Sequence, residues 1–363
     1  MRRALVLAAR GAGQTSPNPM VGAVVVKDGA VVGEGWHARF GGMHAEVAAL
    51  TAAGSAASGA TLYVTLEPCN HSGKTPPCVD AILRADVRRV VYAISDPHTH
   101  AAGGATRLRE NNVDMIANVC RAQASELNAP FFFATHGQPR PFVTLKLALS
   151  IDGAVADASG QPRQLTGRVS RRAVHALRRE ADAIAVGINT ALVDDPALTV
   201  RDVSAPRITP VRVVFDRHAR LPLHSQLVRT ARDIPVWVVA SSVATEAATP
   251  QARADQRERT ARLEHAGVRV IASASLADVL GRLRTDEVRH LLVEGGAGLA
   301  SAFIAAGCVD RLVILQAPVI LGAGALPGFA SLASAAADRL RLTLVHRRTM
   351  GDDLMSTYAV VGD

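Results

Sequence analysis

The sequence predicts an α/β protein built from two domains. The chain has 363 residues, about twice the usual domain size, and its 48% hydrophobic content is enough to bury ordinary cores. Strand-like and helix-like patterns alternate along most of its length. A polar, proline-rich segment at residues 136–141 interrupts this alternation. We therefore expect one domain at residues 1–138 and a second at residues 139–363.

Composition excludes several classes of protein. No run approaches the roughly 18 uncharged apolar residues of a membrane span, and Arg10 interrupts the apolar start before it reaches the length of a secretory signal. Four cysteines are too few for a disulfide framework, which predicts a reducing, cytoplasmic compartment. The formal net charge of +8 suits anionic ligands such as phosphates. Because Arg and Lys are scattered and not clustered, we expect neither a nucleic-acid nor a membrane partner.

The first domain begins with a helix-like segment at residues 1–10, and a hairpin follows around Asp28-Gly29, a pair typical of tight turns. The expected elements are strands from Val21 to Val26 and from Ala30 to Gly35, a helix from His44 to Ala53, a strand from Ala60 to Leu66, a helix from Cys78 to Ala85 and a strand from Arg89 to Ile94. This order predicts a layered α/β domain.

The second domain restarts with a β-branched pattern after the proline-rich break. Strands are expected at Phe142 to Leu149, Ala183 to Ile188, Val211 to Phe215, Val236 to Ala240, Val268 to Ile271 and His290 to Val293. Helices are expected from Ser170 to Ala181, from Ala297 to Ala306 and between several of the strands, and the stretches Arg311 to Leu321 and Leu340 to Val361 read mainly as strands. This part is also an α/β domain.

Three short motifs in the first domain can form a catalytic zinc site. They contain His44, Cys69 and Cys78, which supply three ligands and leave a fourth position for water. Zinc lowers the pKa of bound water, and a carboxylate that is not a ligand can then shuttle protons. Glu46, two residues after His44, is placed for this role.

The order of these residues is close to a known nucleobase-deaminase pattern, H-x-E followed by P-C-x-x-C. Each cysteine here follows a proline, whereas in the pattern only the first one does. However, eight residues separate Cys69 from Cys78 instead of two. A single buried cysteine is usually a small hydrophobic residue, so the hypothesis depends on the ordered combination.

A glycine-rich turn in the second domain is a candidate phosphate site. It follows a strand and precedes the helix that begins near Ala297, so backbone N–H groups can face an anion. The pair Gly296 and Gly298 lacks the third glycine of a Rossmann fingerprint, and Ser301 stands in its place. Alone, this turn is more often an ordinary strand-to-helix connection than a phosphate site.

Longer motifs in both halves resemble the bifunctional riboflavin-biosynthesis deaminase–reductase family. In the first half they are Ser16-Pro17-Asn18-Pro19-Met20-Val21-Gly22, Gly33-Glu34-Gly35-Trp36-His37, His44-Ala45-Glu46-Val47 and residues 64–78 with the long inter-cysteine loop. In the second half they are residues 143–153, Val186-Gly187-Ile188-Asn189-Thr190, residues 194–201 and residues 292–299. The resemblance implies a cytidine-deaminase-like three-layer domain followed by a dihydrofolate-reductase-like domain.

The resemblance also implies roles for individual residues. In the first domain, His44, Cys69 and Cys78 bind Zn²⁺, Glu46 shuttles protons, and Asn18, His71, Lys74 and Asp96 line the substrate pocket. In the second domain, the residues facing NADPH are Ala148, Thr190, Asp194, Gly296, Ala297, Gly298, Leu299, Ala300, Ser301 and Ala302. The residues facing substrate there are Arg178, Leu198, Arg201 and Glu294. We add Lys146 as a candidate to polarise or protonate the sugar-derived group.

The implied reactions are the zinc-dependent hydrolysis of an amino group from a phosphorylated ribosylaminopyrimidine and the NADPH reduction of its ribosyl group to ribityl. Three alternatives stay open: a polynucleotide base deaminase, an interaction protein with structural zinc, and a deaminase whose reductase half is impaired. The first needs an aromatic stacking platform, yet aromatic residues are only 4% of the chain. We also expect a homo-oligomer, although the sequence does not reveal its size.

Four positions depart from the family pattern. Met20 stands where the family usually has Arg, and His98 replaces the commoner Asn. In the second half, Pro162 and Gln164 occupy positions where the family commonly has Ser and Trp. Pro removes a hydrogen-bond donor and Gln removes an aromatic surface, which is the basis of the impaired-reductase alternative.

Overall fold

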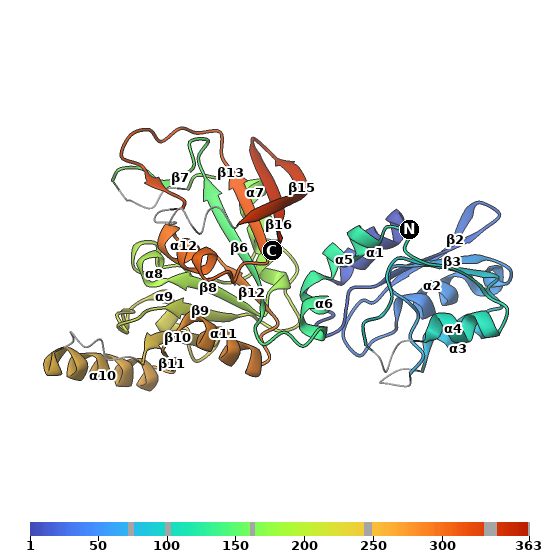
Figure 1. The fold of residues 1–363 in the computed structure, drawn as a ribbon, viewed down its shortest axis with the longest axis horizontal. Helices are drawn as coiled ribbons and strands as arrows, with labels where there is room; N and C mark the ends of the chain where they lie inside the picture. Colours follow the sequence, from blue (N-terminus) through green and yellow to red (C-terminus); the bar gives the residue numbers. More distant parts are fainter. Residues whose placement is uncertain (72–75, 99–102, 160–163, 243–248, 330–339, 362–363) are drawn as a thin grey trace. The chain divides into compact units, whose positions relative to one another are not determined.

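A computed structural model describes residues 1–71, 76–98, 103–159, 164–242, 249–329 and 340–361 (Figure 1). The chain forms two compact units, one of Met1–Gln138 with Pro206–Ile208 and one of Pro139–Ala205 with Thr209–Asp363. Each unit is described by itself. Among the described residues, no helix combines the length and apolar character that crossing a bilayer requires.

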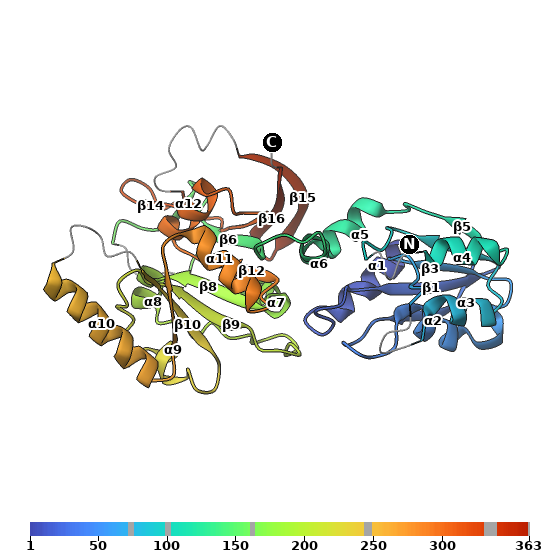
Figure 2. The same cartoon turned by 60° about the horizontal axis from the view of Figure 1, so that its bottom comes forward.

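The first unit contains a five-stranded sheet in the order β2-β1-β3-β4-β5, of which Figure 2 labels β1, β3 and β5. Its strands are β1 (Gly22–Lys27), β2 (Ala30–Trp36), β3 (Thr61–Val64), β4 (Arg89–Tyr92) and β5 (Asp114–Ile116). The helices are α1 (Arg2–Ala8), α2 (Ala45–Ala53), α3 (Cys78–Arg84), α4 (Gly104–Glu110), α5 (Arg121–Leu127) and α6 (Ala129–Thr135), with 3-10 turns at Ala9–Gly11 and Gly54–Ala57. Strands β3, β4 and β5 run parallel, and β1 is antiparallel to both of its neighbours.

The alternation of side chains along β1 explains the three layers of the first unit. Ala23 and Val25 belong to the core that α2, α3 and α4 complete, whereas Val24 packs with α1 on the other face. Gly35 on β2 lets α2 approach closely, since a Cβ there would lie 2.4 Å from the backbone nitrogen of Ala49. This close packing fixes the start of α2 over the sheet.

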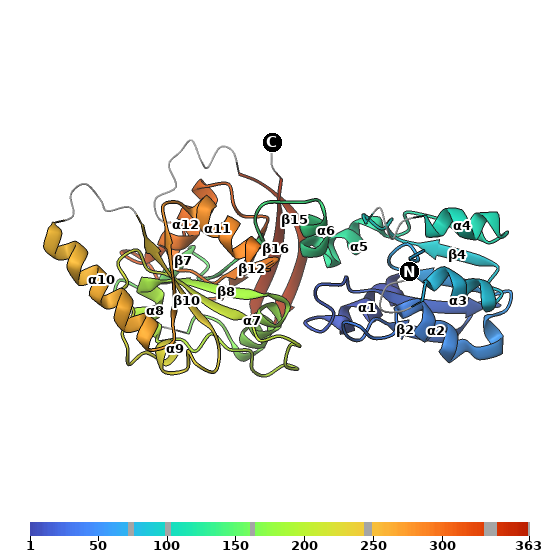
Figure 3. The same ribbon diagram turned by 90° about the horizontal axis from the view of Figure 1, so that it is seen from below.

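The second unit is built on a nine-stranded sheet in the order β11-β10-β9-β8-β12-β6-β13-β16-β15 (Figure 3). Its strands are β6 (Phe142–Leu149), β8 (Ala183–Gly187), β9 (Val211–Phe215), β10 (Val236–Ser241), β11 (Arg269–Ser273), β12 (His290–Val293), β13 (Arg311–Gln316), β15 (Arg341–Met350) and β16 (Asp353–Val361). The strands from β11 to β13 are parallel, and β16 is antiparallel to both of its neighbours, β13 and β15. Strands β7 (Ala154–Ala156) and β14 (Leu326–Pro327) form a separate pair.

Helices cover both faces of the large sheet. They are α7 (Arg168–Glu180), α8 (Ile188–Asp194), α9 (Gln226–Arg229), α10 (Pro250–His265), α11 (Leu276–Thr285) and α12 (Ala297–Ala305). One core joins the sheet to α11 and α12, and another joins it to α8, α9 and α10. On β6, Leu145 and Leu147 enter the first of these cores, so the alternation places Lys146 on the opposite face of the strand.

The structure confirms the two-part α/β architecture and most expected elements. Four expected strands extend past the observed ends: β3 ends at Val64 instead of Leu66, β4 at Tyr92 instead of Ile94, β8 at Gly187 instead of Ile188, and β13 at Gln316 instead of Leu321. The stretch from Leu340 to Val361 is two strands joined by a turn at Gly351, whose φ is +69°. No expected element corresponds to α4, β5, α5 and α6 in the first unit or to β7 and β14 in the second.

Candidate functional site

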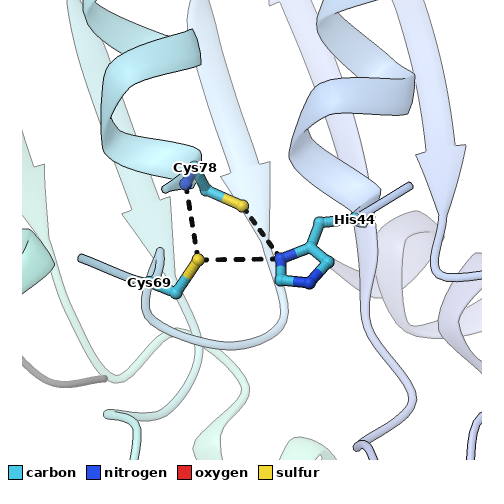
Figure 4. Close-up of side chains that lie close together, drawn as sticks. All are labelled: His44, Cys69 and Cys78. Carbon is cyan, nitrogen blue, oxygen red and sulfur yellow. Dashed lines mark hydrogen bonds between the residues drawn. The ribbon is translucent and has the colours of Figure 1, made fainter. Parts of the chain in front are cut away.

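Three segments of the first unit bring His44, Cys69 and Cys78 together (Figure 4). His44 is the residue before α2, Cys78 is the first residue of α3, and Cys69 lies in the loop after β3. The imidazole Nδ1 of His44 is 3.2 Å from the Sγ of Cys78 and 3.6 Å from the Sγ of Cys69. Zn–S bonds of about 2.3 Å and Zn–N bonds of about 2.0 Å place tetrahedral ligands about 3.6 Å apart, so these atoms fit a zinc ion.

The two thiols are linked to each other and to the start of α3. The backbone N–H of Cys78 donates to the Sγ of Cys69 over 3.3 Å. The hydrogen bond between the thiols lowers the pKa of Cys69, with His44 adding to this shift and burial opposing it. The same hydrogen bond raises the pKa of Cys78, and burial adds to that shift. The pair therefore gives up a first proton easily and holds the second until a cation takes its place.

Glu46 lies in the first turn of α2 with its side chain directed into the same site. It is only 4% exposed. Burial, followed by the nearby Cys69, raises the pKa of its carboxyl to about 7. A carboxyl group with a pKa near neutrality can both accept and release protons under physiological conditions, as a proton shuttle must.

Asn18 reaches this site through a histidine to which the sequence reading gave no role. The ring of His37 packs edge-on against that of His44, with centroids 5.4 Å apart, and its Nε2 lies 3.3 Å from the Nδ2 of Asn18. The other ring nitrogen of His37, Nδ1, lies 3.1 Å from the carbonyl oxygen of Met43 and must donate to it. In neutral His37, Nε2 therefore accepts from the amide N–H of Asn18, which leaves the Oδ1 of Asn18 available to a ligand.

The loop that carries Asn18 is held by Asn128, which the sequence reading also missed. The Oδ1 of Asn128 accepts from the backbone N–H of Met20 over 2.8 Å, and its Nδ2 donates to the carbonyl of Met20 over 2.9 Å. The chain is thus fixed at position 20 through backbone atoms, which Met supplies as well as Arg would. No local pattern near Asn128 points to this contact across 108 residues.

The remaining predicted substrate residues of the first unit differ in their placement. Asp96 is half-buried, burial raises its pKa, and it interacts electrostatically with Glu67 and Cys69, so it lies beside the metal ligands. His71 is exposed, and Lys74 lies outside the described residues. His98 is exposed with its ring against Phe131, and the described residues form no second group of metal ligands that includes it.

In the second unit, Arg178 on α7 and Glu294 after β12 form a buried ion pair. The Nε and Nη2 of Arg178 donate to the two carboxylate oxygens over 2.5 and 2.9 Å, and the side chains are only 12% and 8% exposed. Nη1 of Arg178 also donates to the carbonyl of Thr199 over 3.0 Å. This bidentate geometry fixes the position of the Glu294 carboxylate.

Lys146 lies near this pair and near Asp194. Burial lowers the pKa of its ammonium, Glu294 and Asp194 oppose that shift, and Arg178 adds to it. Burial raises the pKa of Asp194, and the charge of Lys146 opposes that shift. Four segments of the second unit, β6, α7, α8 and the residue after β12, therefore bring a lysine, an arginine and two carboxylates close enough for their charges to interact.

Seven of the ten predicted NADPH residues, Gly296 to Ala302, lie at the N-cap and in the first turns of α12, while Ala148 is on β6 and Thr190 and Asp194 are on α8. A Cβ on Gly296 would lie 3.3 Å from the Oγ1 of Thr190 on α8, so these two positions are neighbours. Of the others, Gly298 and Ala302 are exposed, Ala148 and Leu299 are half-buried, and Ala297, Ala300 and Ser301 are buried.

The other residues assigned to the second unit have mixed surroundings. Leu198 is buried in the core and has a φ of +49°. Arg201 is exposed, and its backbone N–H donates to the Nδ1 of His175 over 3.2 Å. Gln164 is exposed, and Pro162 lies outside the described residues.

Comparisons with known proteins agree with both halves. Residues 1–94 match the family of the cytidine and deoxycytidylate deaminase zinc-binding region, and residues 141–356 match the RibD C-terminal domain. The chain is 41% identical to the riboflavin biosynthesis protein RibD of Aquifex aeolicus, over 98% of this chain and 96% of that one, and 39% identical to RibD of Escherichia coli, with 92% of each covered.

Solved structures give the same result. RibD of Acinetobacter baumannii is 36% identical, with a TM-score of 0.78, and covers 99% of this chain and 97% of its own. A diaminohydroxyphosphoribosylaminopyrimidine deaminase and 5-amino-6-(5-phosphoribosylamino)uracil reductase of Thermotoga maritima is 32% identical, with a TM-score of 0.81 and the same coverage. Both halves of the chain are thus matched together in single proteins, and none of these matches favours a deaminase without a reductase.

Proposed function

The chain belongs to the RibD family of bifunctional riboflavin-biosynthesis proteins, and from this premise we propose the substrate and the residues of its two reactions. The first unit hydrolyses the 2-amino group of 2,5-diamino-6-ribosylamino-4(3H)-pyrimidinone 5′-phosphate. The second unit then uses NADPH to reduce the ribosyl group to ribityl. The Thermotoga relative is named for both of these activities, which supports the assignment.

One observation carries the deaminase assignment: three convergent ligand atoms lie beside a buried carboxyl with a pKa of about 7. When bound, zinc lowers the pKa of water toward neutrality. His44, Cys69 and Cys78 hold the ion, and Glu46 accepts a proton from the attacking water and delivers it to the departing amino group. Asn18 presents its Oδ1 to an N–H group of the pyrimidine, and Asp96 lines the same pocket.

His71 and Lys74 complete this assignment as ligands for the phosphate of the substrate. Both side chains can carry a positive charge and can donate N–H hydrogen bonds to an oxyanion. Both residues lie in the long loop between the two cysteines. The anionic end of the substrate would therefore bind next to the metal-binding segment.

In the second unit, the start of α12 and its neighbour Thr190 bind NADPH, which supplies the hydride. Lys146 polarises and protonates the sugar-derived oxygen as hydride arrives at C1′. The Arg178 guanidinium is already engaged with Glu294 and Thr199, so it holds Glu294 in place, and the exposed Arg201 is the better ligand for the substrate's phosphate.

The test is to identify the product by mass spectrometry after incubation of the diaminopyrimidine ribotide with zinc-loaded protein and NADPH. The proposal requires the deaminated ribitylamino compound. A product that keeps its 2-amino group, or its ribosyl group, would contradict one half of it. Single-stranded DNA is the control substrate and should stay unmodified.

The boundary at residue 138, a homo-oligomeric state and a cytoplasmic location are also parts of this proposal. Light scattering of the purified full chain tests the oligomer: a mass above one chain of 38.0 kDa supports it, and the monomer mass contradicts it.

A further inference from the structure

Helix α4 contacts both segments that carry the cysteine ligands. The carboxylate of Glu67, two residues before Cys69, accepts from the backbone N–H of Ala105 over 3.1 Å. Gly104 packs directly on the same segment, since a Cβ there would lie 1.8 Å from the carbonyl oxygen of Pro68. The start of α4 therefore packs on the loop after β3, directly before the first cysteine.

Arg107, in the next turn of α4, connects this segment to the second cysteine. Its Nη1 donates to the Oδ1 of Asn70 over 2.9 Å, and its Nη2 donates to the Oδ1 of Asp80 over 2.7 Å. Asn70 directly follows Cys69, and Asp80 lies two residues after Cys78 on α3. One guanidinium thus holds both ends of the loop between the cysteines.

The length of this loop gives the contact its importance. In a C-x-x-C arrangement, two intervening residues keep the sulfur atoms close, whereas here eight residues separate them. The entropy cost of bringing the ends of a loop together rises with its length. A rigid, bidentate donor between the two ends offsets that cost because it fixes their spacing before a metal arrives.

We propose that Arg107 is a positioning residue for zinc, which sets the spacing between Cys69 and Cys78 by bridging Asn70 and Asp80. The inference rests on the three zinc ligands and is independent of which pyrimidine the enzyme uses. Arg107 and Asp80 are 40% and 33% exposed, so a plain surface ion pair would contribute little to stability. Its effect should instead appear in metal affinity, where partners beyond the ligands typically matter about 10- to 100-fold.

The experiment compares Arg107→Ala with Arg109→Ala in the full-length protein. Arg109 is on the same helix, is exposed, and loses the same charge and helix-forming side chain when substituted. Zinc affinity is measured by competition with a chromophoric chelator, and the thiolate-to-metal absorption of the cobalt(II)-substituted protein is recorded. We expect zinc binding about tenfold weaker and an altered cobalt spectrum for Arg107→Ala, with Arg109→Ala like the wild type.

Two further variants keep the proposal falsifiable if Arg107→Ala folds poorly. Arg107→Lys can reach only one of the two acceptors and should give an intermediate affinity, and Asp80→Asn should weaken zinc binding without changing residue 107. Equal zinc affinities and equal cobalt spectra for the wild type and the folded Arg107 and Asp80 variants would overturn the proposal. Because no turnover is measured, a wrong substrate assignment would not affect this result.

Discussion

The metal site of the first unit and the Arg178–Glu294 site of the second unit neutralise their charged groups in opposite ways. In the first unit, two thiols and an imidazole crowd within 4.8 Å, and the thiols can both ionise only when a cation joins them. In the second unit, Arg178 and Glu294 already neutralise each other and satisfy each other's hydrogen bonds. The deaminase site therefore needs its metal ion to neutralise the thiolates, whereas the charged side chains of the reductase site neutralise each other without a cofactor.

The chain offers a direct way to observe each unit separately. It has two tryptophans, Trp36 in β2 of the first unit and Trp237 in β10 of the second. In the full chain, Trp36→Phe leaves fluorescence that reports only the second unit, and Trp237→Phe leaves the first.

The largest expected effect is that of Glu46→Gln on deamination. Gln keeps the shape of the side chain and removes the group that accepts the proton, so kcat for ammonia release should fall about 10³-fold. Zinc content and the reduction of supplied deaminated intermediate should stay at the wild-type level. Ammonia release within a few fold of wild type would show that another group moves the proton.

Next in size is the effect of Glu294→Gln on the stability of the second unit. The substitution leaves the guanidinium of Arg178 buried without its partner charge, which costs about 3 kcal/mol. Urea unfolding in the Trp36→Phe background measures it. The matched control is Glu258→Gln on α10, where both members of the pair with Arg262 are about 60% exposed and the loss should stay below about 1 kcal/mol. Equal losses for the two variants would mean that the Arg178 pair behaves as a surface pair.

A third prediction concerns pH and His290. Burial, with Arg311 contributing, lowers the pKa of this imidazole to about 4. Its ring lies between the hydroxyl of Thr144 and the carbonyl of Glu180. Between about pH 6.5 and pH 4 the unfolded chain binds a proton at His290 and the folded chain does not. The free energy of unfolding should therefore decrease by about 3 kcal/mol as the pH drops from 6.5 to 4, so the protein becomes less stable.

Urea midpoints at several pH values in the Trp36→Phe background measure this slope. His290→Gln removes the titrating group and should flatten the slope in that range. The same slope with and without His290 would assign the pH dependence to other groups.

The smallest effect considered is that of Lys146→Met on reduction. Met fills similar space without the ammonium, so kcat for NADPH oxidation should fall about 10²-fold while ammonia release is unchanged. The pKa of Lys146 is lowered, so activity that depends on its proton should decline at a lower pH than for an exposed lysine. Unchanged NADPH oxidation would remove Lys146 from the mechanism.

The sequence predicted that His44, Cys69 and Cys78 come together, because their signal is local: each lies in a short motif at the start of a helix or after a strand. It also predicted the positions of most strands along the chain. It could not give His37, Asn128 or Arg107 a role, because their contacts join segments that only the fold brings together. The helices α4, α5 and α6 were not predicted; they have seven residues each and lack side-chain caps, as do α1 and α3, which were predicted.

The most direct test of the account is a two-channel assay of one protein preparation before and after zinc removal. Ammonia release is followed with the diaminopyrimidine ribotide, and NADPH oxidation is followed with the deaminated intermediate. The account predicts that a chelator abolishes the first and leaves the second intact, and that added zinc restores the first. Loss of both activities on chelation, or persistence of ammonia release in metal-free protein, would contradict it.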